Sequence, residues 1–212
     1  MDKKEVFFIR LWTIQDERGY NQLKENKVFS GNIEYVDYDF RRPYRWMIEQ
    51  MEKRLKTPRV DLSTYPVWAW YQWNGTNKRK PDLRYTAHLP KGKKGYRVEF
   101  EIEEEAVLLS DFDLFHHVIN YWYLPKGEKD DKSFELEMEK NQIELFTLQD
   151  FNKHSRVIDD LRLRIEKSWD LIFDLEWYDK YINYPKDKKS IQATFWELRW
   201  EQVIDVKGFI AK

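Results

Sequence analysis

Alternation of apolar and polar residues predicts β-strands in two central segments, because successive side chains on a strand point to opposite faces. Residues 96–102 alternate cleanly between apolar and charged side chains. Residues 66–73 instead carry Trp or Tyr at both parities, and aromatic residues favour strands. We therefore expect this second, Trp-rich strand either to be buried on both sides or to line a pocket with one face.

Apolar runs predict further strands near both ends of the chain. We expect an opening strand at 6–14, a short buried strand at 107–109, and closing strands at 191–198 and 203–210. The segment 199–202 would then connect the two closing strands as a hairpin.

Apolar residues spaced three or four apart predict helices on either side of the Trp-rich strand. Such stripes fill residues 44–55 and 155–175. Asp16 is expected to cap a helix that runs through Leu23, and Ser110 or Asp111 to cap another.

The mixture of these elements indicates the fold class. Strands and helices do not alternate strictly, and the charged segment 126–132 is predicted to be a surface loop. We predict a single α+β domain over residues 1–212, in which a largely antiparallel mixed sheet packs with about four helices.

Charge and composition narrow the classes of function. The formal net charge of -1 disfavours a generally basic nucleic-acid binder, although it leaves room for a local basic patch. The absence of Cys excludes disulfides, thiolate zinc sites and cysteine nucleophiles, and with only four His we expect no metal centre. No glycine-rich phosphate loop or nucleophile elbow is present. Because the first apolar run is short and interrupted by Arg10, we expect a cytoplasmic protein with no membrane segment.

Glu197 is the first candidate for chemistry. It shares its parity with the apolar residues Ile191, Ala193 and Phe195, so the pattern predicts a carboxylate on the core-facing side of the last strand but one. An unpaired buried carboxylate is costly, and such a group should be paired, protonated or exposed in a cleft. The alternative is that Glu197 lies at the strand end, where it reaches solvent or pairs with an Arg.

Two other acidic groupings have simpler interpretations. Asp82 with Glu99 and Glu101 superficially resembles a metal-dependent nuclease site, but the strand alternation places both glutamates on a solvated face. The acidic and His residues of 110–117 fit either a metal site or, as we expect, a capped helix start.

A basic cluster follows the Trp-rich strand, which contributes Trp68 and Trp70. Its members are Lys78, Arg79, Lys80 and Arg84. Basic side chains beside aromatic platforms are typical of nucleotide or single-strand binding. The alternative is a solvated loop beside buried rings.

Several segments resemble an uncharacterised bacterial family, domain-of-unknown-function family 3841. They follow one another in order along nearly the whole chain, at residues 11–15, 44–51, 66–73, 80–84, 107–120 and 192–198. The resemblance names a family and implies no established activity.

The order of elements is also similar to that of small ADP-ribosyltransferase toxins. In those proteins an opening strand contacts NAD, an aromatic residue of a helix stacks on nicotinamide, and a late strand carries the catalytic Glu. The similarity implies that Glu197 is catalytic, and it implies NAD-contacting roles for Arg10, Trp12, Thr13, Gln15 and Tyr44. The chain departs from the toxins in having no Gln-x-Glu pair, since Gln192 lies five residues before Glu197.

This second resemblance implies transfer of ADP-ribose from NAD, as co-substrate, to a nucleic-acid or protein acceptor. The protein would then be a bacterial toxin or anti-phage effector with an antitoxin-type protein partner. The alternative from another class is a non-catalytic module that binds a nucleotide, a single strand or a protein through the Trp-rich strand and the basic loop.

Overall fold

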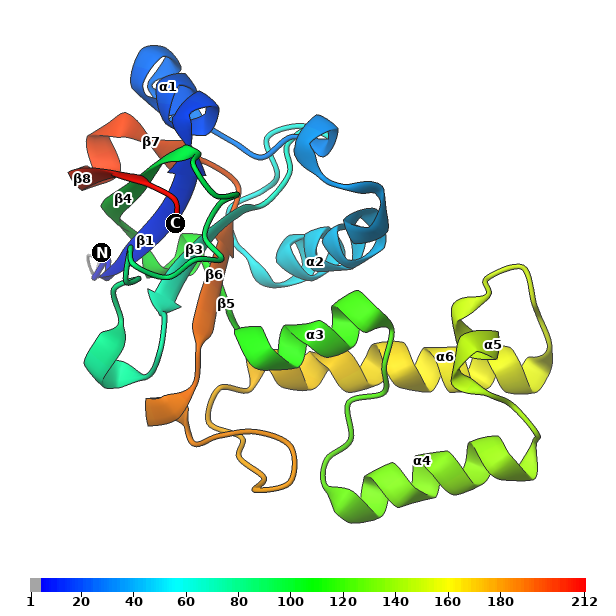
Figure 1. Ribbon diagram of the computed structural model, residues 1–212. Coiled ribbons are helices and arrows are strands. Elements are labelled where there is room, and N and C mark those ends of the chain that lie inside the picture. Colours follow the sequence, from blue (N-terminus) through cyan, green and yellow to red (C-terminus); the bar gives the residue numbers. More distant parts are fainter. Residues whose placement is uncertain (1–4) are drawn as a thin grey trace. The chain divides into compact units, whose positions relative to one another are not determined.

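A computed structural model describes residues 5–212 of the chain (Figure 1). The chain divides into two compact units: the first combines the residues up to Leu109 with Ser190–Lys212, and the second is Ser110–Lys189. Strands dominate the first unit and helices the second. The expected α+β class is confirmed.

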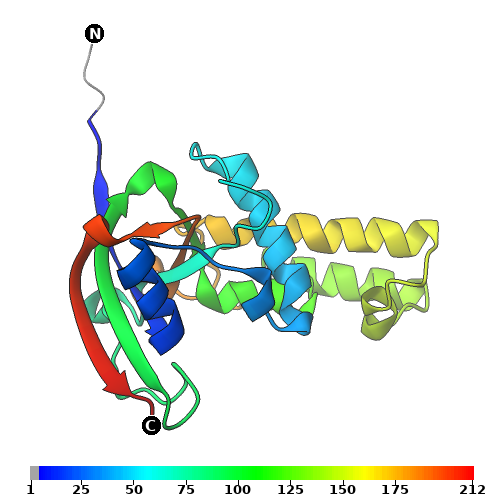
Figure 2. The same cartoon turned by 90° about the horizontal axis from the view of Figure 1, so that it is seen from above.

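Six strands form one sheet in the order β5-β6-β3-β1-β4-β8. Every pair with a defined register is antiparallel, as predicted. Figure 2 shows the long strands β4 and β8 side by side and curving together. The strands are β1 (Phe8–Asp16), β3 (Val67–Gln72), β4 (Lys94–Glu103), β5 (Leu108–Asp111), β6 (Ile191–Phe195) and β8 (Val203–Ile210).

The central strand β1 has very different neighbours on its two sides. It pairs with β4 along its whole length, from Phe8 opposite Glu103 to Asp16 opposite Gly95. Within residues 5–212, its ladder with β3 consists of one position, Trp12 opposite Trp70. The backbones of β1 and β3 therefore separate beyond that position, and the sheet is split there.

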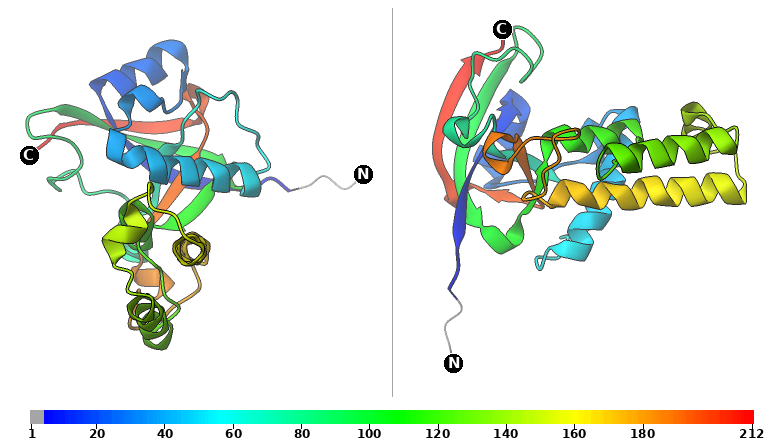
Figure 3. Two further views of the ribbon diagram at one scale, coloured as in Figure 1. Left: turned by 90° about the vertical axis from the view of Figure 1, so that its right-hand side faces the viewer. Right: turned by 90° about the horizontal axis from the view of Figure 1, so that it is seen from below.

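Two helices of the first unit begin and end close to the predicted positions. Helix α1 (Glu17–Asn26) follows β1 directly, because the Asp16 side chain accepts a hydrogen bond from the Gly19 N–H at 2.8 Å and caps it. Helix α2 (Arg41–Arg54) buries Met47 and Met51 of the predicted stripe. In the left view of Figure 3, α2 lies in front of the sheet.

The closing hairpin predicted from the sequence is wrong. Strand β6 pairs with β3, and β8 pairs with β4 at the other side of the sheet. Between them the short strand β7 (Leu198–Arg199) pairs with β2 (Val28–Phe29), and a 3-10 helix at Trp200–Gln202 completes the crossing. The sequence of 199–202 predicted a turn, because the pairing of β7 with the distant β2 produces no local pattern of apolar and polar residues.

The solvated position predicted for Glu99 is also wrong, because its residue is only 8% exposed. Lys80 Nζ lies 2.5 Å from one carboxylate oxygen and Arg10 Nη1 lies 3.4 Å from the other. Burial raises the pKa of Glu99, but the hydrogen bond from Lys80 and the charges of Lys80 and Arg10 outweigh it, and the pKa is lowered.

The second unit contains four α-helices and two 3-10 helices, at Trp169–Phe173 and Lys186–Lys188. Asp111 caps the first helix, as predicted, and Ser155 caps the last, which ends at Ser168 rather than continuing to residue 175. In Figure 3 the long helix α6 runs beside α4. Arg164 of α6 donates a hydrogen bond to Glu137 of α4 at 2.6 Å. The helices are α3 (Phe112–Asn120), α4 (Glu128–Lys140), α5 (Leu145–Gln149) and α6 (Arg156–Ser168).

The surface loop predicted at 126–132 is wrong, because α4 begins at Glu128. Its acidic first turn suits the positive end of the helix dipole. A single buried ring, Phe134, stacks on Tyr123 with centroids 4.1 Å apart. One buried position in thirteen residues gives too weak a stripe to reveal a helix from the sequence.

A buried ion pair holds the second unit together at its two ends. Lys189 Nζ lies 3.3 Å from Asp111 Oδ2, and both side chains are almost inaccessible to solvent. The same ammonium donates to the Trp177 carbonyl at 2.9 Å. Removal of one partner leaves the other charge buried without compensation, which is strongly destabilising.

Lys189→Met is expected to lower the free energy of unfolding by about 3–5 kcal/mol, measured by urea denaturation. Lys188→Met, at the exposed neighbouring position, is the matched control and should change little. Adding Asp111→Asn to Lys189→Met should recover part of the loss, since Asn removes the charge and still caps a helix. Equal stabilities of Lys189→Met and Lys188→Met would contradict a stabilising role for the buried ion pair.

Glu99 is expected to make the free energy of unfolding depend on pH in the acid range. Its folded pKa lies below its unfolded pKa of about 4.3, so its contribution is complete above that pH and is lost as pH falls toward the folded pKa. Glu99→Gln should therefore lose stability at pH 7 and flatten the acid side of the stability curve, measured by thermal unfolding between pH 3 and 7. A Gln variant whose acid dependence equals that of the wild type would rule this out.

Candidate functional site

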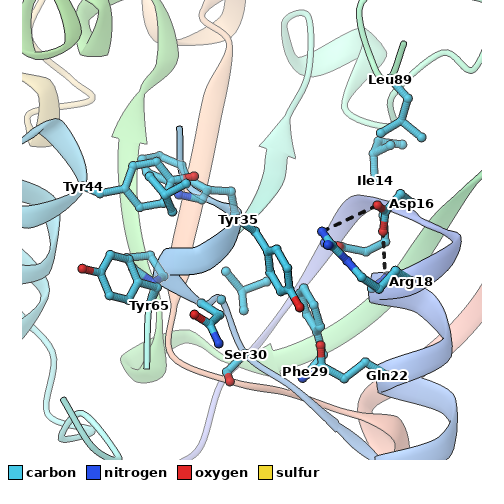
Figure 4. Close-up of a pocket in the computed structure, with 18 residues that line it drawn as sticks. Ile14, Asp16, Arg18, Gln22, Phe29, Ser30, Tyr35, Tyr44, Tyr65 and Leu89 are labelled. Atoms are coloured by element: carbon cyan, nitrogen blue, oxygen red, sulfur yellow. Dashed lines mark hydrogen bonds and ion pairs between the residues drawn. The ribbon is translucent and has the colours of Figure 1, made fainter. Parts of the chain in front are cut away.

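A cavity of about 290 Å³ opens in the first unit where β1 and β3 separate. We call it the split cavity. The end of β1, the start of α1, the segment 29–36, Tyr44 of α2 and the segment 65–68 line it. Figure 4 shows the rings of Tyr44 and Tyr65 on one side and Asp16 with Arg18 on the other.

Thr13 fixes the floor of the split. Its side chain is fully buried, and its hydroxyl donates to the Trp68 carbonyl at 2.8 Å. A side chain of β1 thus satisfies a carbonyl of β3 at the point where backbone pairing has ended. The same hydroxyl accepts from Gln15 Nε2 at 2.7 Å, which holds the Gln15 amide at the cavity wall.

Aromatic rings form the opposite wall. The Tyr44 ring lies edge-on to Trp68 with centroids 5.7 Å apart, and it lies 6.3 Å from the Tyr65 ring. Burial raises the pKa of Tyr44 to about 12, so its phenol is neutral at physiological pH. A neutral, largely apolar wall of this kind suits a flat aromatic ligand.

One cation, Arg18, lines the cavity beside the start of α1, where Asp16 contributes a carboxylate that caps the helix. Arg18 is exposed, and its guanidinium carbon lies 3.4 Å from the centre of the Tyr35 ring. Arg18 also approaches Asp16 at 3.8 Å, a long ion pair between two exposed groups. The first turn of α1 begins here, where backbone N–H groups favour an anion.

Two glycines allow the walls to approach closely. Gly31 exchanges backbone hydrogen bonds with Tyr65 at 3.0 and 3.1 Å, and a Cβ at Gly31 would lie 2.7 Å from the Pro66 carbonyl oxygen. A Cβ at Gly19 would lie 2.7 Å from Gln15 Oε1. Any larger residue at Gly31 would force the segment 29–36 away from the segment 65–68.

Glu197 does not face the core as its parity predicted, because β6 ends at Phe195. Its side chain is 22% exposed and accepts from Arg199 Nη2 at 3.1 Å, which matches the alternative of a strand end paired with an Arg. It lies directly before Leu198, whose backbone pairs with Phe29. Phe29 lines the split cavity, but Glu197 itself is not among the lining residues.

The structure divides the other predicted NAD-contacting residues between two faces of β1. Gln15 and Tyr44 line the split cavity, and Thr13 lies beneath it. Arg10 and Trp12 are not among the lining residues. Arg10 instead pairs with Glu101 at 2.7 Å.

The predicted nucleic-acid residues are divided as well. Trp68 lines the split cavity, and Trp70 lies opposite Trp12 in the strand register. The basic cluster lines a second, wider hollow of about 1070 Å³ together with Trp12, and we call it the basic groove. Its cluster members are Lys78, Arg79, Lys80 and Arg84.

Several cavity residues escaped the sequence analysis, among them Arg18, Ser30, Tyr35 and Tyr65. Their segments carry no periodic pattern, since 29–36 contains a two-residue strand and a short 3-10 helix. Gly31 is the one feature of this segment that stands out in the sequence, because glycine allows a close backbone approach.

Residues 5–212 contain no cluster of three or more His, Asp or Glu side chains arranged to hold a metal ion. None of the helices among these residues has the length and apolar character needed to cross a membrane.

Comparison with known proteins places the chain in a family. No curated protein and no solved structure matches it significantly. A family model described as a domain of unknown function, DUF3841, matches residues 10–204, which include the split cavity, Glu197 and most of the basic groove. The match covers most of both compact units. The chain therefore belongs to the DUF3841 family.

Proposed function

We propose that the split cavity binds NAD and that the protein transfers ADP-ribose from it to a nucleic-acid or protein acceptor. One observation carries the proposal. Gln15, Tyr44 and Trp68 come from three separate segments and line one cavity, and Glu197 directly precedes Leu198, which pairs with the cavity-lining Phe29. The first two of these residues and Glu197 were assigned to NAD from the order of elements alone.

The nicotinamide ring would lie against the aromatic wall. Tyr44, Tyr65 and Trp68 offer faces and edges on which a flat, electron-poor ring packs. Gln15 carries an amide oxygen and nitrogen that complement the nicotinamide carboxamide, and Thr13 fixes the orientation of that side chain. The volume of about 290 Å³ lies at the lower end of small-molecule sites and suits half of a dinucleotide.

The pyrophosphate would lie toward α1. Arg18 supplies a guanidinium that binds phosphate oxygens in a bidentate way. The long contact between Arg18 and Asp16 is weak enough to be exchanged for a phosphate. The first backbone N–H groups of α1 add a partial positive charge at the same place.

Glu197 would act on the ribose. Its carboxylate accepts a hydrogen bond from a ribose hydroxyl and stabilises the positive charge that develops at C1′ as the bond to nicotinamide breaks. The nicotinamide leaves with the bonding electrons, and a nucleophile of the acceptor forms the new bond at C1′. Arg199 Nη2 donates to the carboxylate and holds it in place before NAD binds.

Such chemistry would make the protein harmful to its own cell. Consumption of NAD and modification of cellular acceptors are properties of a toxin or an anti-phage effector. We propose that an antitoxin-type protein restrains it by covering the split cavity.

Glu197→Gln is expected to lower transfer of label from NAD to cell-lysate acceptors by at least about 100-fold, because it removes a charge aimed at the transition state. NAD affinity should stay within about threefold, since ground-state contacts remain. Glu201→Gln, at an exposed site outside the cavity lining, is the control. NAD binding without any transfer or nicotinamide release by the wild type would indicate a non-catalytic module.

Arg18→Gln is expected to weaken NAD binding by about tenfold, because one charge-assisted phosphate contact is lost. Free nicotinamide should bind as before, since Arg18 lies away from the Tyr44 and Tyr65 wall. Calorimetry with both ligands and with Arg45→Gln, an exposed control, separates these effects. Equal losses for NAD and nicotinamide would contradict the assigned orientation.

A further inference from the structure

The basic groove concentrates positively charged side chains, although the chain as a whole has a formal net charge of -1. Parts of the chain that are far apart in the sequence meet there: Trp12 of β1, the segment 73–84, Arg97 of β4, and residues 207–210 with Lys212. The groove shares no lining residue with the split cavity, so it is a separate site.

Two of the guanidinium groups are held in place by backbone carbonyls. Arg79 Nε donates to the Tyr71 carbonyl at 3.1 Å, and its guanidinium carbon lies 4.4 Å from the centre of the Tyr71 ring. Arg97 Nη1 donates to the Pro81 carbonyl at 2.8 Å. Each guanidinium has five N–H groups, so both retain donors for a ligand after these contacts. Cations fixed in this way lose little freedom when they bind phosphate.

Two lysines at the groove are exposed. Among residues 5–212, no Asp or Glu side chain forms an ion pair with Lys78 or Lys207. The one carboxylate of a side chain in the lining, Asp82, is neutralised by Arg84, which donates to it from Nε and Nη2. Those bonds hold the pKa of Asp82 well below its usual range. The groove is therefore positive without a competing free side-chain acid.

Aromatic rings lie among these cations. Trp73 is half-buried, and its ring contacts Tyr85 edge-on at 5.6 Å and His88 at 6.1 Å. Phe209 of β8 contacts the same His88 at 6.2 Å. Trp73 and Phe209 line the groove, and Tyr85 is more than half exposed. These rings offer platforms on which unpaired bases stack.

We infer that the basic groove binds single-stranded nucleic acid. The phosphates would bind Lys78, Arg79 and Lys207. The bases would stack on the rings of Trp73, Tyr85 and Phe209. A duplex fits the chemistry less well, because its base faces are already stacked and only its phosphates would bind. The volume of about 1070 Å³ exceeds the need of a single phosphate or mononucleotide.

The test is fluorescence anisotropy with a labelled 12-nucleotide single strand, the matched duplex and polyglutamate of similar charge. We expect the single strand to bind more tightly than either competitor at 100 mM salt. Combined Lys78→Gln and Lys207→Gln should weaken binding about tenfold and reduce the slope of log affinity against log salt by about 1.4, as two lost phosphate contacts require. Trp73→Leu should weaken binding about tenfold, with little change in that slope.

The matched control is the pair Lys129→Gln and Lys140→Gln, which removes two exposed cations of α4 in the second unit. Control affinities equal to the wild type are expected, and the melting temperature of each variant verifies folding. Arg18→Gln and Glu197→Gln should bind the strand normally, so this test is independent of NAD chemistry. Absence of binding, equal binding of duplex or polyglutamate, or equal losses in both lysine pairs would overturn the inference.

Discussion

The separation of β1 from β3 is the constraint on which the candidate site depends. Backbone pairing ends at Trp12 and Trp70, and the Thr13 hydroxyl takes over by binding the Trp68 carbonyl. A buried carbonyl without a partner would cost free energy, so this side-chain bond makes the split tolerable. The gap it leaves becomes a cavity because α1 follows β1 directly and α2 contributes Tyr44. Gly31 then allows the remaining wall to close against Tyr65.

Alternation along β1 gives the strand two functions. Thr13 and Gln15 face the split cavity and its floor, whereas Arg10 and Trp12 face the side on which Glu99 is buried. Lys80 links this second side to the basic groove, because it pairs with Glu99 and lines the groove. One central strand thus contributes its end to the split cavity and Trp12 to the basic groove.

Local patterns predicted the elements well where one face is buried and the other is not. The alternation of 96–102 and the stripe of α2 each indicated the correct element, and Asp16 marked the correct helix start. Pairing between distant segments was not predictable in the same way. Strand β7 is two residues long and has its partner in β2, so the expected hairpin with β8 was wrong. Glu99 was misplaced because cations from a loop and another strand cover it, which no local pattern records. For the site, the sequence indicated Gln15, Tyr44 and Trp68 but not Arg18 or Tyr65, whose segments lack periodicity.

A crystal structure with an NAD analogue whose bond between nicotinamide and ribose cannot be cleaved tests the central claim most directly. The account predicts the nicotinamide against Tyr44 and Trp68, the pyrophosphate beside Arg18, and the ribose within hydrogen-bond reach of Glu197. Analogue bound only in the basic groove, or a split cavity that stays empty at saturating analogue, would contradict it.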